Sequence, residues 1–224
     1  MRKMTKKSLD ELARIMPVIT EREMMQYWGG KAYNVGGEGT AEDPIVLQAT
    51  FNLVSYSFGD ASTNYSMSSA IKAGINEFNN FDMQQVDGKY YKFEMVINEI
   101  KSPQDHYPYA PGETAIVGNK AVVESEQTSG AHRIGGADDS ANGASGIALY
   151  YNTAKLYYGS GADFNDAIQR ATVHEIGHSL GLGDYSNTNK YGIMEQFSGS
   201  SMPGKLDSGT VIKMIELNKG NVGG

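Results

Sequence analysis

The sequence predicts one domain of the α+β or α/β class, with a sheet that largely precedes the central helix. Runs of β-branched and aromatic residues that end in turn residues predict strands. Segments with apolar residues three or four positions apart predict amphipathic helices. The order strand, helix, several strands, helix, loops and helix is typical of a layered domain that contains both kinds of element.

The length and composition fit an ordinary globular domain. The chain has 224 residues, of which 40% are hydrophobic and 20% charged. It is therefore long enough to bury a sizeable core, and its composition does not indicate wholesale disorder. Its net charge of -7 repels phosphate backbones, so nucleic acid is not an expected partner. We expect a monomer.

Cysteine is absent from the chain, which excludes disulfides, thiol nucleophiles and cysteine-based zinc sites. Any metal must therefore be held by His, Asp or Glu. The longest uninterrupted apolar runs are about five residues, such as Ile15 to Ile19, far shorter than a membrane span or the core of a conventional secretory signal.

Residues 1–30 differ in composition from the rest, being basic at the start and rich in Met. Their end resembles the leader peptides of double-glycine type, which peptidase-containing exporters remove after a Gly-Gly pair. The resemblance rests on Gly29 and Gly30, preceded by Tyr27, Met24, Glu23 and Ile19. It implies an exporter as partner, secretion after cleavage near Gly30, and a folded domain over 31–224. The alternative is a frayed terminus on a cytoplasmic protein. No role is assigned to Trp28.

The first strand and the first helix are predicted in succession. Residues 44–60 are dominated by β-branched and aromatic types and close in a Gly-Asp turn, which indicates a strand. Residues 66–81 have the period of an amphipathic helix, with Ser68 or Ser69 as a cap. The apolar stripe of that helix consists of Ile71, Ile75 and Phe78.

Further strands are predicted over 90–100, 115–124 and 146–154. The first of these alternates apolar residues on one face: Tyr91, Phe93, Met95 and Ile97. Residues 127–145 are rich in Gly, Ser, Asp and Asn, which predicts a loop. Its oxygen-bearing residues Asp138, Asp139 and Asn142 are a candidate calcium site, but they lack the spacing of a known calcium loop, so a flexible loop is preferred.

Residues 162–180 are predicted to form the main helix, with Asp163 or Asn165 as its cap and Gly181 as a left-handed stop. A closing helix is predicted over 207–220. Its buried stripe should consist of Val211, Met214 and Ile215.

The main helix carries the motif HEIGHSLGLGD, residues 174–184. His174 and His178 are one turn plus about 40° apart, so both imidazoles project from one face and can reach one ion. Glu175 lies off that line, where it can contact a metal-bound water rather than the metal. Gly181 and Gly183 allow the chain to turn back.

That turn brings Asp184 toward the same ion as a third ligand. One zinc position then stays open for water, as a catalytic site requires. The remaining histidines, His106 and His132, are expected to be surface or structural residues.

The motif resembles the long zinc signature of the metzincin metallopeptidases, HExxHxxGxxH, in the form that ends in Asp, as in snapalysin-like peptidases. The resemblance implies zinc ligation by His174, His178 and Asp184, with Glu175 as general base and acid. It also implies an α+β zincin fold: a mixed twisted sheet, a backing helix, an active-site helix, and a small C-terminal part ending in a helix.

Metzincins have a Met-containing turn beneath the metal, and Gly192-Ile193-Met194 resembles it. The Tyr that some families place two residues after the Met is Gln196 here, with Tyr185 or Tyr191 as substitutes. In that fold the strand before the active-site helix, here within Gly146 to Asn152, pairs with substrate backbone, so peptide would bind by strand addition.

These features predict a zinc endopeptidase that acts on a protein or peptide substrate with one catalytic Zn²⁺. One alternative is a non-catalytic, zinc-stabilised binding or toxin-like module. Another is an exported effector whose peptidase activity is restricted to one partner. The endopeptidase and the non-catalytic module would both contain zinc, so zinc analysis does not distinguish them. Peptide cleavage with and without a chelator does.

Overall fold

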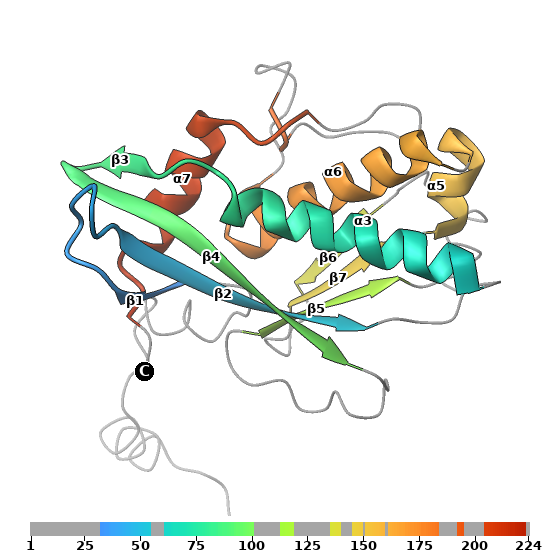
Figure 1. Cartoon of the computed structure of the whole chain (residues 1–224), viewed down its shortest axis with the longest axis horizontal. Helices are drawn as coiled ribbons and strands as arrows, with labels where there is room; N and C mark the ends of the chain where they lie inside the picture. Colours follow the sequence, from blue (N-terminus) through green and yellow to red (C-terminus); the bar gives the residue numbers. More distant parts are fainter. Residues whose placement is uncertain are drawn as a thin grey trace, which may run out of the picture.

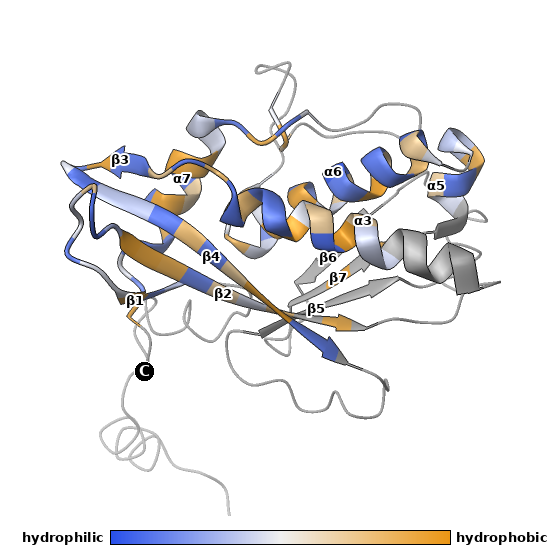
Figure 2. Ribbon diagram, viewed as in Figure 1, coloured by the Kyte–Doolittle hydropathy of each residue, from blue (hydrophilic) through white to orange (hydrophobic). Residues whose placement is uncertain are grey.

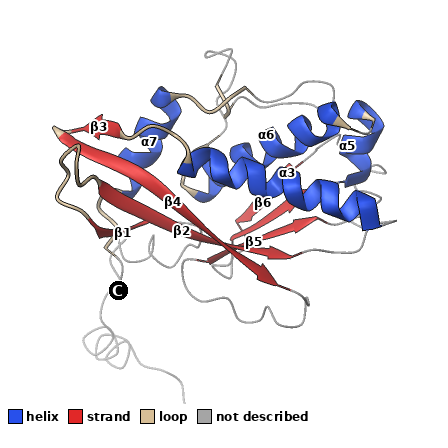
Figure 3. Ribbon diagram, viewed as in Figure 1, coloured by secondary structure: helices blue, strands red, loops and turns tan. Residues whose placement is uncertain are grey.

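The structure is a computed structural model that describes residues 32–54, 61–100, 113–118, 135–139, 145–149, 151–159, 161–183, 192–194 and 204–222. It has the α+β architecture expected from the sequence: a mixed open sheet with helices α3 and α6 lying on one face (Figures 1 and 3). In chain order the elements are β1 Tyr33–Gly36, β2 Ile45–Val54, α3 Ala61–Asn79, β3 Gln84–Val86, β4 Lys89–Ile100, β5 Glu113–Gly118, β6 Gly135–Asp139, β7 Ser145–Leu149, α5 Tyr151–Tyr158, α6 Ala162–Ser179 and α7 Ser208–Asn218.

The sheet is parallel at its centre and antiparallel at its edges. The strand order is β3-β4-β2-β5-β7-β6, and β1 pairs with β2. β2 is parallel to both β4 and β5, and β5 is parallel to β7. The outer strands β3 and β6, and also β1, pair antiparallel with their neighbours. The sheet is therefore mixed, as predicted.

The predictions of the first long strands are confirmed. β2 covers 45–54 of the predicted 44–60, and β4 covers the whole of 90–100. On β4 the alternation has the expected consequence, because Tyr91, Phe93 and Met95 are buried while Lys92 and Glu94 between them are exposed. Figure 2 shows apolar and polar residues along these two strands.

The predicted loop over 127–145 is wrong in part, because residues 135–139 form β6. The two glycines and two aspartates of β6 have low strand propensity. However, all of β6 pairs with β7, and this pairing outweighs the weak intrinsic preference of those residues. Asp138 and Asp139 therefore belong to a strand rather than to a ligand-bearing loop, and the calcium site finds no support.

The predicted strand over 146–154 is also wrong in its second half. β7 ends at Leu149, and residues 151–158 form helix α5, which packs against α6. The apolar run continues without a break through this boundary, and short apolar runs do not distinguish a strand from a helix by period. The buried pair Thr153 and Ala154 shows that tertiary packing decided the outcome.

The position of β7 changes the expected place of substrate pairing. β7 has β5 on one side and β6 on the other, so its backbone is already paired on both sides. Strand addition to 146–152 is therefore wrong. Within the described residues, the outer strand on this side of the sheet is β6.

Two short strands were not predicted. β3 and β4 form a hairpin whose turn residues Asp87 and Gly88 have φ of 51° and 76°. An Asp-Gly pair is the residue choice that such a turn favours, so the signal was present in the sequence. β1 has no comparable signal in the sequence, and its four residues pair with the start of β2.

Helix α3 begins at Ala61, five residues before the predicted start at 66. Ser68 and Ser69 therefore lie inside the helix and are not its cap. The helix can extend through the polar residues before them because Ser and Asn cost only a few tenths of a kcal/mol inside a helix. Ile71, Ile75 and Phe78 are buried as predicted. At Gly74 the helix meets α6 closely, since a Cβ there would lie 2.7 Å from the Gln169 carbonyl oxygen.

The closing helix α7 confirms the predicted stripe, since Val211, Met214 and Ile215 are buried. Asp207 caps its first turn: one carboxylate oxygen accepts from the Thr210 backbone N–H at 3.0 Å and the other from the Thr210 hydroxyl at 2.8 Å. A cap of this kind fixes the start of a helix.

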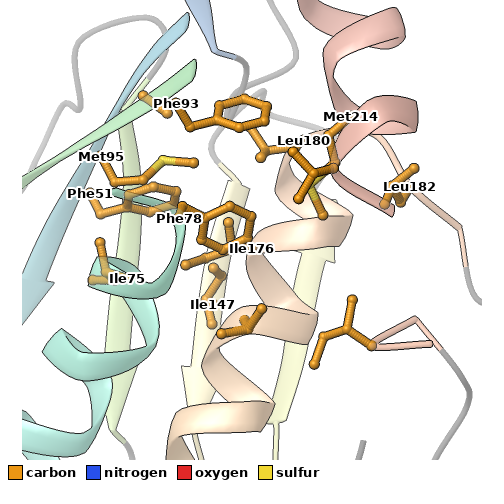
Figure 4. Packing of buried hydrophobic residues seen from close by; sticks show 14 of the residues in the cluster. Phe51, Ile75, Phe78, Phe93, Met95, Ile147, Ile176, Leu180, Leu182 and Met214 are labelled. Atoms are coloured by element: carbon orange, nitrogen blue, oxygen red, sulfur yellow. The ribbon is translucent and has the colours of Figure 1, made fainter. Parts of the chain in front are cut away.

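One core joins the sheet, α3, α6 and α7. Figure 4 shows Phe78 of α3 between the strand residues Phe51 and Met95 and the α6 residue Ile176, with Leu180 and Met214 above. Phe78 and Phe93 meet edge to face, with ring centroids 6.0 Å apart. Among the described residues, no helix combines the length and hydropathy needed to span a membrane.

Several sequence predictions lie outside the described residues. They concern the 1–30 leader with its Gly29-Gly30 pair and Trp28, and His106, His132, Asn142, Asp184, Tyr185, Tyr191 and Gln196.

Candidate metal centre

The motif lies on the C-terminal half of α6, which runs from Ala162 to Ser179 within the predicted 162–180. The predicted caps Asp163 and Asn165 are wrong, because Gly161 occupies the N-cap with φ 104° and no side chain caps the helix. The helix instead gains its stability from its buried face, which carries the motif into the core.

The structure brings the two motif histidines together as the spacing predicts. His174 Nε2 and His178 Nε2 lie 3.1 Å apart, and the two rings are nearly perpendicular at 87°. His174 is only 4% exposed, whereas His178 is partly exposed. One imidazole is thus fixed in the interior, and the other lies between the interior and the surface.

The Nδ1 atoms of both rings are held by backbone carbonyls. His174 Nδ1 lies 2.6 Å from the Ile193 oxygen, and His178 Nδ1 lies 2.9 Å from the Leu182 oxygen. A carbonyl only accepts, so each Nδ1 must carry the proton that it donates. In neutral rings both Nε2 atoms then have a lone pair, and these lone pairs face each other.

Two facing lone pairs at this distance need a positive charge between them. Either a proton or a metal ion meets that need. Two nitrogen ligands at 2.0–2.1 Å from a tetrahedral zinc are about 3.3 Å apart, close to the distance found here. A metal-binding His also usually donates its other ring N–H to a carbonyl or carboxylate. The residues present therefore fit a zinc ion, with His174 and His178 as two of its ligands.

The turn that follows α6 places the acceptor of His178. Gly181 has φ 93°, which confirms it as the left-handed stop. Its N–H donates to the His178 carbonyl, and the Leu182 N–H donates to the Gly177 carbonyl, both at 2.9 Å. This is the Schellman arrangement. It turns the chain so that the Leu182 carbonyl reaches back to the His178 ring.

A second turn places the acceptor of His174. Ile193 and Met194 are fully buried, and they lie beneath the motif half of α6. A Cβ on Gly177 would be only 2.2 Å from Met194 Sδ, so the absence of a side chain at 177 lets Met194 touch the helix. Gly192 forms an isolated bridge with Lys205, which holds the turn from its other side.

Glu175 follows the first histidine and is buried, with 3% of its surface exposed. Its Oε2 atom is enclosed by protein. A buried carboxylate beside two imidazoles has the chemistry of a proton acceptor, because burial makes its charged form costly.

Asp184, the predicted third ligand, lies beyond the described range that ends at Gly183. Among the described residues, no third His, Asp or Glu joins the histidine pair. The described part of the site thus comprises two imidazoles, their two carbonyl acceptors and one buried carboxylate.

Sequence reasoning missed three parts of the site. The Ile193 and Leu182 carbonyls have no sequence signal, because every residue has a backbone oxygen. Gly177 had a weak one, since a glycine inside a helix costs about 1 kcal/mol relative to Ala and so needs a reason. The reason is the contact with Met194.

The two imidazoles, their carbonyl acceptors and Glu175 form an HExxH arrangement on α6, and the chemistry of these groups fits a divalent metal. No family model matches the chain, and no curated protein matches it. Among solved structures, the chain is similar to archaemetzincin from Methanopyrus kandleri, with 10% identity, a TM-score of 0.40, and coverage of 77% of this chain and 96% of that one. It is also similar to metalloproteinase-II from Bacteroides fragilis, with 14% identity, a TM-score of 0.40, and coverage of 84% of this chain.

The chain spans 57% of the length of the Bacteroides fragilis protein. The second neighbour is named as a metalloproteinase, and both similarities are low. The interpretation of the site therefore depends on the residues of this chain and not on these two similarities.

Proposed function

We propose that this protein is a zinc-dependent endopeptidase. The observation that carries the proposal is the His174–His178 pair, with Nε2 atoms 3.1 Å apart and both Nδ1 atoms held by backbone carbonyls, beside the buried Glu175. This arrangement fixes the ring orientation and the tautomer that metal ligation requires.

In the proposed mechanism His174 and His178 would hold the zinc ion, with Asp184 as the third protein ligand expected from the motif. Zinc, when bound, supplies Lewis-acid polarisation of the scissile carbonyl and lowers the pKa of water. Glu175 takes a proton at a carboxylate oxygen as the water oxygen bonds to the carbonyl carbon. It then delivers that proton to the amine as the carbon–nitrogen bond breaks. The Ile193 and Leu182 carbonyls keep both imidazoles oriented throughout.

Peptide binding by strand addition is proposed at β6. This strand lies at the end of the described sheet, beside β7, and contacts α6. An outer strand offers backbone donors and acceptors to an extended peptide. The substrate would then lie along the side of the sheet nearest the active-site helix.

The test of the proposed function uses the full chain, zinc analysis, and hydrolysis of casein and a peptide library with and without a chelator. The wild-type protein should contain one zinc ion and lose activity on chelation. Glu175→Ala should keep zinc but lose activity by about 10²–10⁴-fold, the usual contribution of a general base. Glu216→Ala, an exposed acid on α7, is the matched control.

Near-full activity of Glu175→Ala would refute the base assignment. A protein that contains zinc but cleaves nothing in the library would indicate the non-catalytic binding module. Cleavage confined to one cognate protein would indicate the restricted effector.

We also propose that residues 1–30 are a leader removed on export, leaving a catalytic domain over 31–224. The support for this proposal is the sequence resemblance at Gly29 and Gly30 to leaders of double-glycine type. Mass spectrometry of the protein from its native culture should find a new N-terminus at Lys31. An intact N-terminus in the culture medium, or retention in the cells, would oppose this proposal.

A further inference from the structure

The buried side chain of Asn218 joins three segments of the chain. Asn218 is the last residue of α7 and is 1% exposed. Its Nδ2 donates to the Leu180 carbonyl at 3.0 Å and to the Met214 carbonyl at 2.8 Å. Its Oδ1 accepts from the Ala32 N–H at 3.1 Å and from Asn221 Nδ2 at 3.2 Å. Both donors and both acceptor positions of the amide are thus used.

The Leu180 carbonyl is the point at which the active-site helix ends. The last carbonyls of a helix have no partner within it, and here Asn218 supplies one from another element. Two residues later the Leu182 carbonyl accepts from His178 Nδ1 at 2.9 Å. The bond from Asn218 therefore fixes the backbone from which the acceptor of His178 is presented.

Hydrogen bonds also connect Ala32 and Asn34 to Asn221, which follows α7. Asn221 Nδ2 donates to the Ala32 carbonyl at 3.1 Å, and the Asn34 N–H donates to the Asn221 carbonyl at 2.9 Å. Asn34 also forms a parallel bridge with Val222. Residues 32–34 continue into β1, which pairs with β2.

We propose that Asn218 is a positioning residue for the zinc site and acts on His178 through the backbone of Leu180 to Leu182. This inference rests on the proposed function. It assigns to Asn218 more than a contribution to stability: the C-terminal end of α7 is coupled, through the bond from Asn218 to the Leu180 carbonyl, to the orientation of one metal ligand. Groups that orient a metal ligand typically change metal affinity by 10–100-fold when they are lost.

The test measures the zinc dissociation constant of the full chain by competition with a chromophoric chelator, while circular dichroism establishes that each variant is folded. Asn218→Asp preserves size but removes both N–H donors, and Asn218→Leu removes all four bonds. Both variants should bind zinc about tenfold more weakly, the lower end of that range. kcat should fall, with KM within about twofold of wild type because no substrate contact is lost.

Two matched controls separate positioning from stability. Asn221→Ala cuts bonds to Ala32 and Asn218 but leaves the bond from Asn218 to Leu180 in place. Lys219→Ala cuts an exposed ion pair with Asp87 at the same end of α7. Both should leave the zinc dissociation constant within about twofold of wild type. Equal zinc affinity in folded Asn218→Asp and wild type would overturn the proposal, whereas a wild-type protein that binds no zinc would overturn the proposed function itself.

A second measurement needs no variant. Coupling between two sites is reciprocal, so zinc should slow hydrogen exchange at the Ala32 amide, which donates to Asn218. Unchanged exchange at Ala32, with slowed exchange at Leu180 to Leu182, would contradict the coupling even if neither Asn218 variant folds.

Discussion

Met194 Sδ lies against the backbone of Gly177, 2.2 Å from the place where a side chain at that position would begin. The contact holds the 193–194 turn against α6, and this turn presents the Ile193 carbonyl to His174. The glycine between the two motif histidines is therefore part of the support of the histidine pair.

Gly177→Ala tests that support. The added methyl group must push Met194 away, and overpacking of this kind typically costs about 1–3 kcal/mol. We expect a lower melting temperature together with about tenfold weaker zinc binding, because the acceptor of His174 moves with the turn. Calorimetry and zinc competition measure the two effects.

Gly74→Ala is the matched control for this substitution. It overpacks the crossing of α3 and α6, where a Cβ would lie 2.7 Å from the Gln169 oxygen, so stability should fall without a change in zinc affinity. If both variants lose zinc affinity equally, the Met194 contact has no special role.

The left-handed turn at Gly181 gives a second prediction. An Ala at φ 93° is strained, and the usual cost of such a conformation is about 1–2 kcal/mol. Gly181→Ala should therefore lower the free energy of unfolding by about that amount, measured by denaturant titration. Gly181→Asn should recover part of the loss, since Asn tolerates this region best after Gly. Equal losses for Ala and Asn would argue against backbone strain as the cause.

The hydroxyl of Tyr158, the last residue of α5, is buried and has no hydrogen-bond partner among the described residues. Burial raises the pKa of Tyr158 above its usual value, and the nearby Arg170 lowers it in part. A raised folded-state pKa contributes stability that is complete below the unfolded-state value and is lost as pH rises through the folded-state value.

Tyr158→Phe removes a buried hydroxyl that has no hydrogen-bond partner among the described residues, so it should be more stable than wild type by about 1 kcal/mol at neutral pH. It should also lose less stability between neutral and strongly alkaline pH. Unfolding by denaturant across that pH range measures both effects. Tyr157→Phe on the same helix is the control, and the same change in both variants would rule out a specific effect of Tyr158.

Zinc binding should stabilise the protein, because a ligand that binds only the folded state adds about 2.7 kcal/mol at one hundred times its dissociation constant. We expect a higher melting temperature with zinc than with a chelator. His178→Gln should abolish most of this difference, whereas His106→Gln, outside the motif, should not. A zinc shift that survives in His178→Gln would place the metal elsewhere.

The sequence predicts those parts of the fold and site that depend on side-chain period and on motif spacing. The β4 alternation, the α7 stripe, the Gly181 stop and the convergence of His174 and His178 are all of this kind. What it does not predict depends on partners distant in the chain. β6 forms because β7 is beside it, α5 because α6 covers it, and the carbonyl acceptors of the histidines have no residue-type signal.

The place of β6 at the end of the described sheet has a consequence for solubility. An outer strand whose backbone lacks a neighbour invites a second copy of the same strand, and proteins counter this with charge. β6 ends in Asp138 and Asp139. Two such strands from different molecules would bring four negative charges together, on proteins that already carry a net charge of -7 each. An acidic sequence of this kind is expected to disfavour pairing with a second copy of the strand more than pairing with an uncharged or basic peptide.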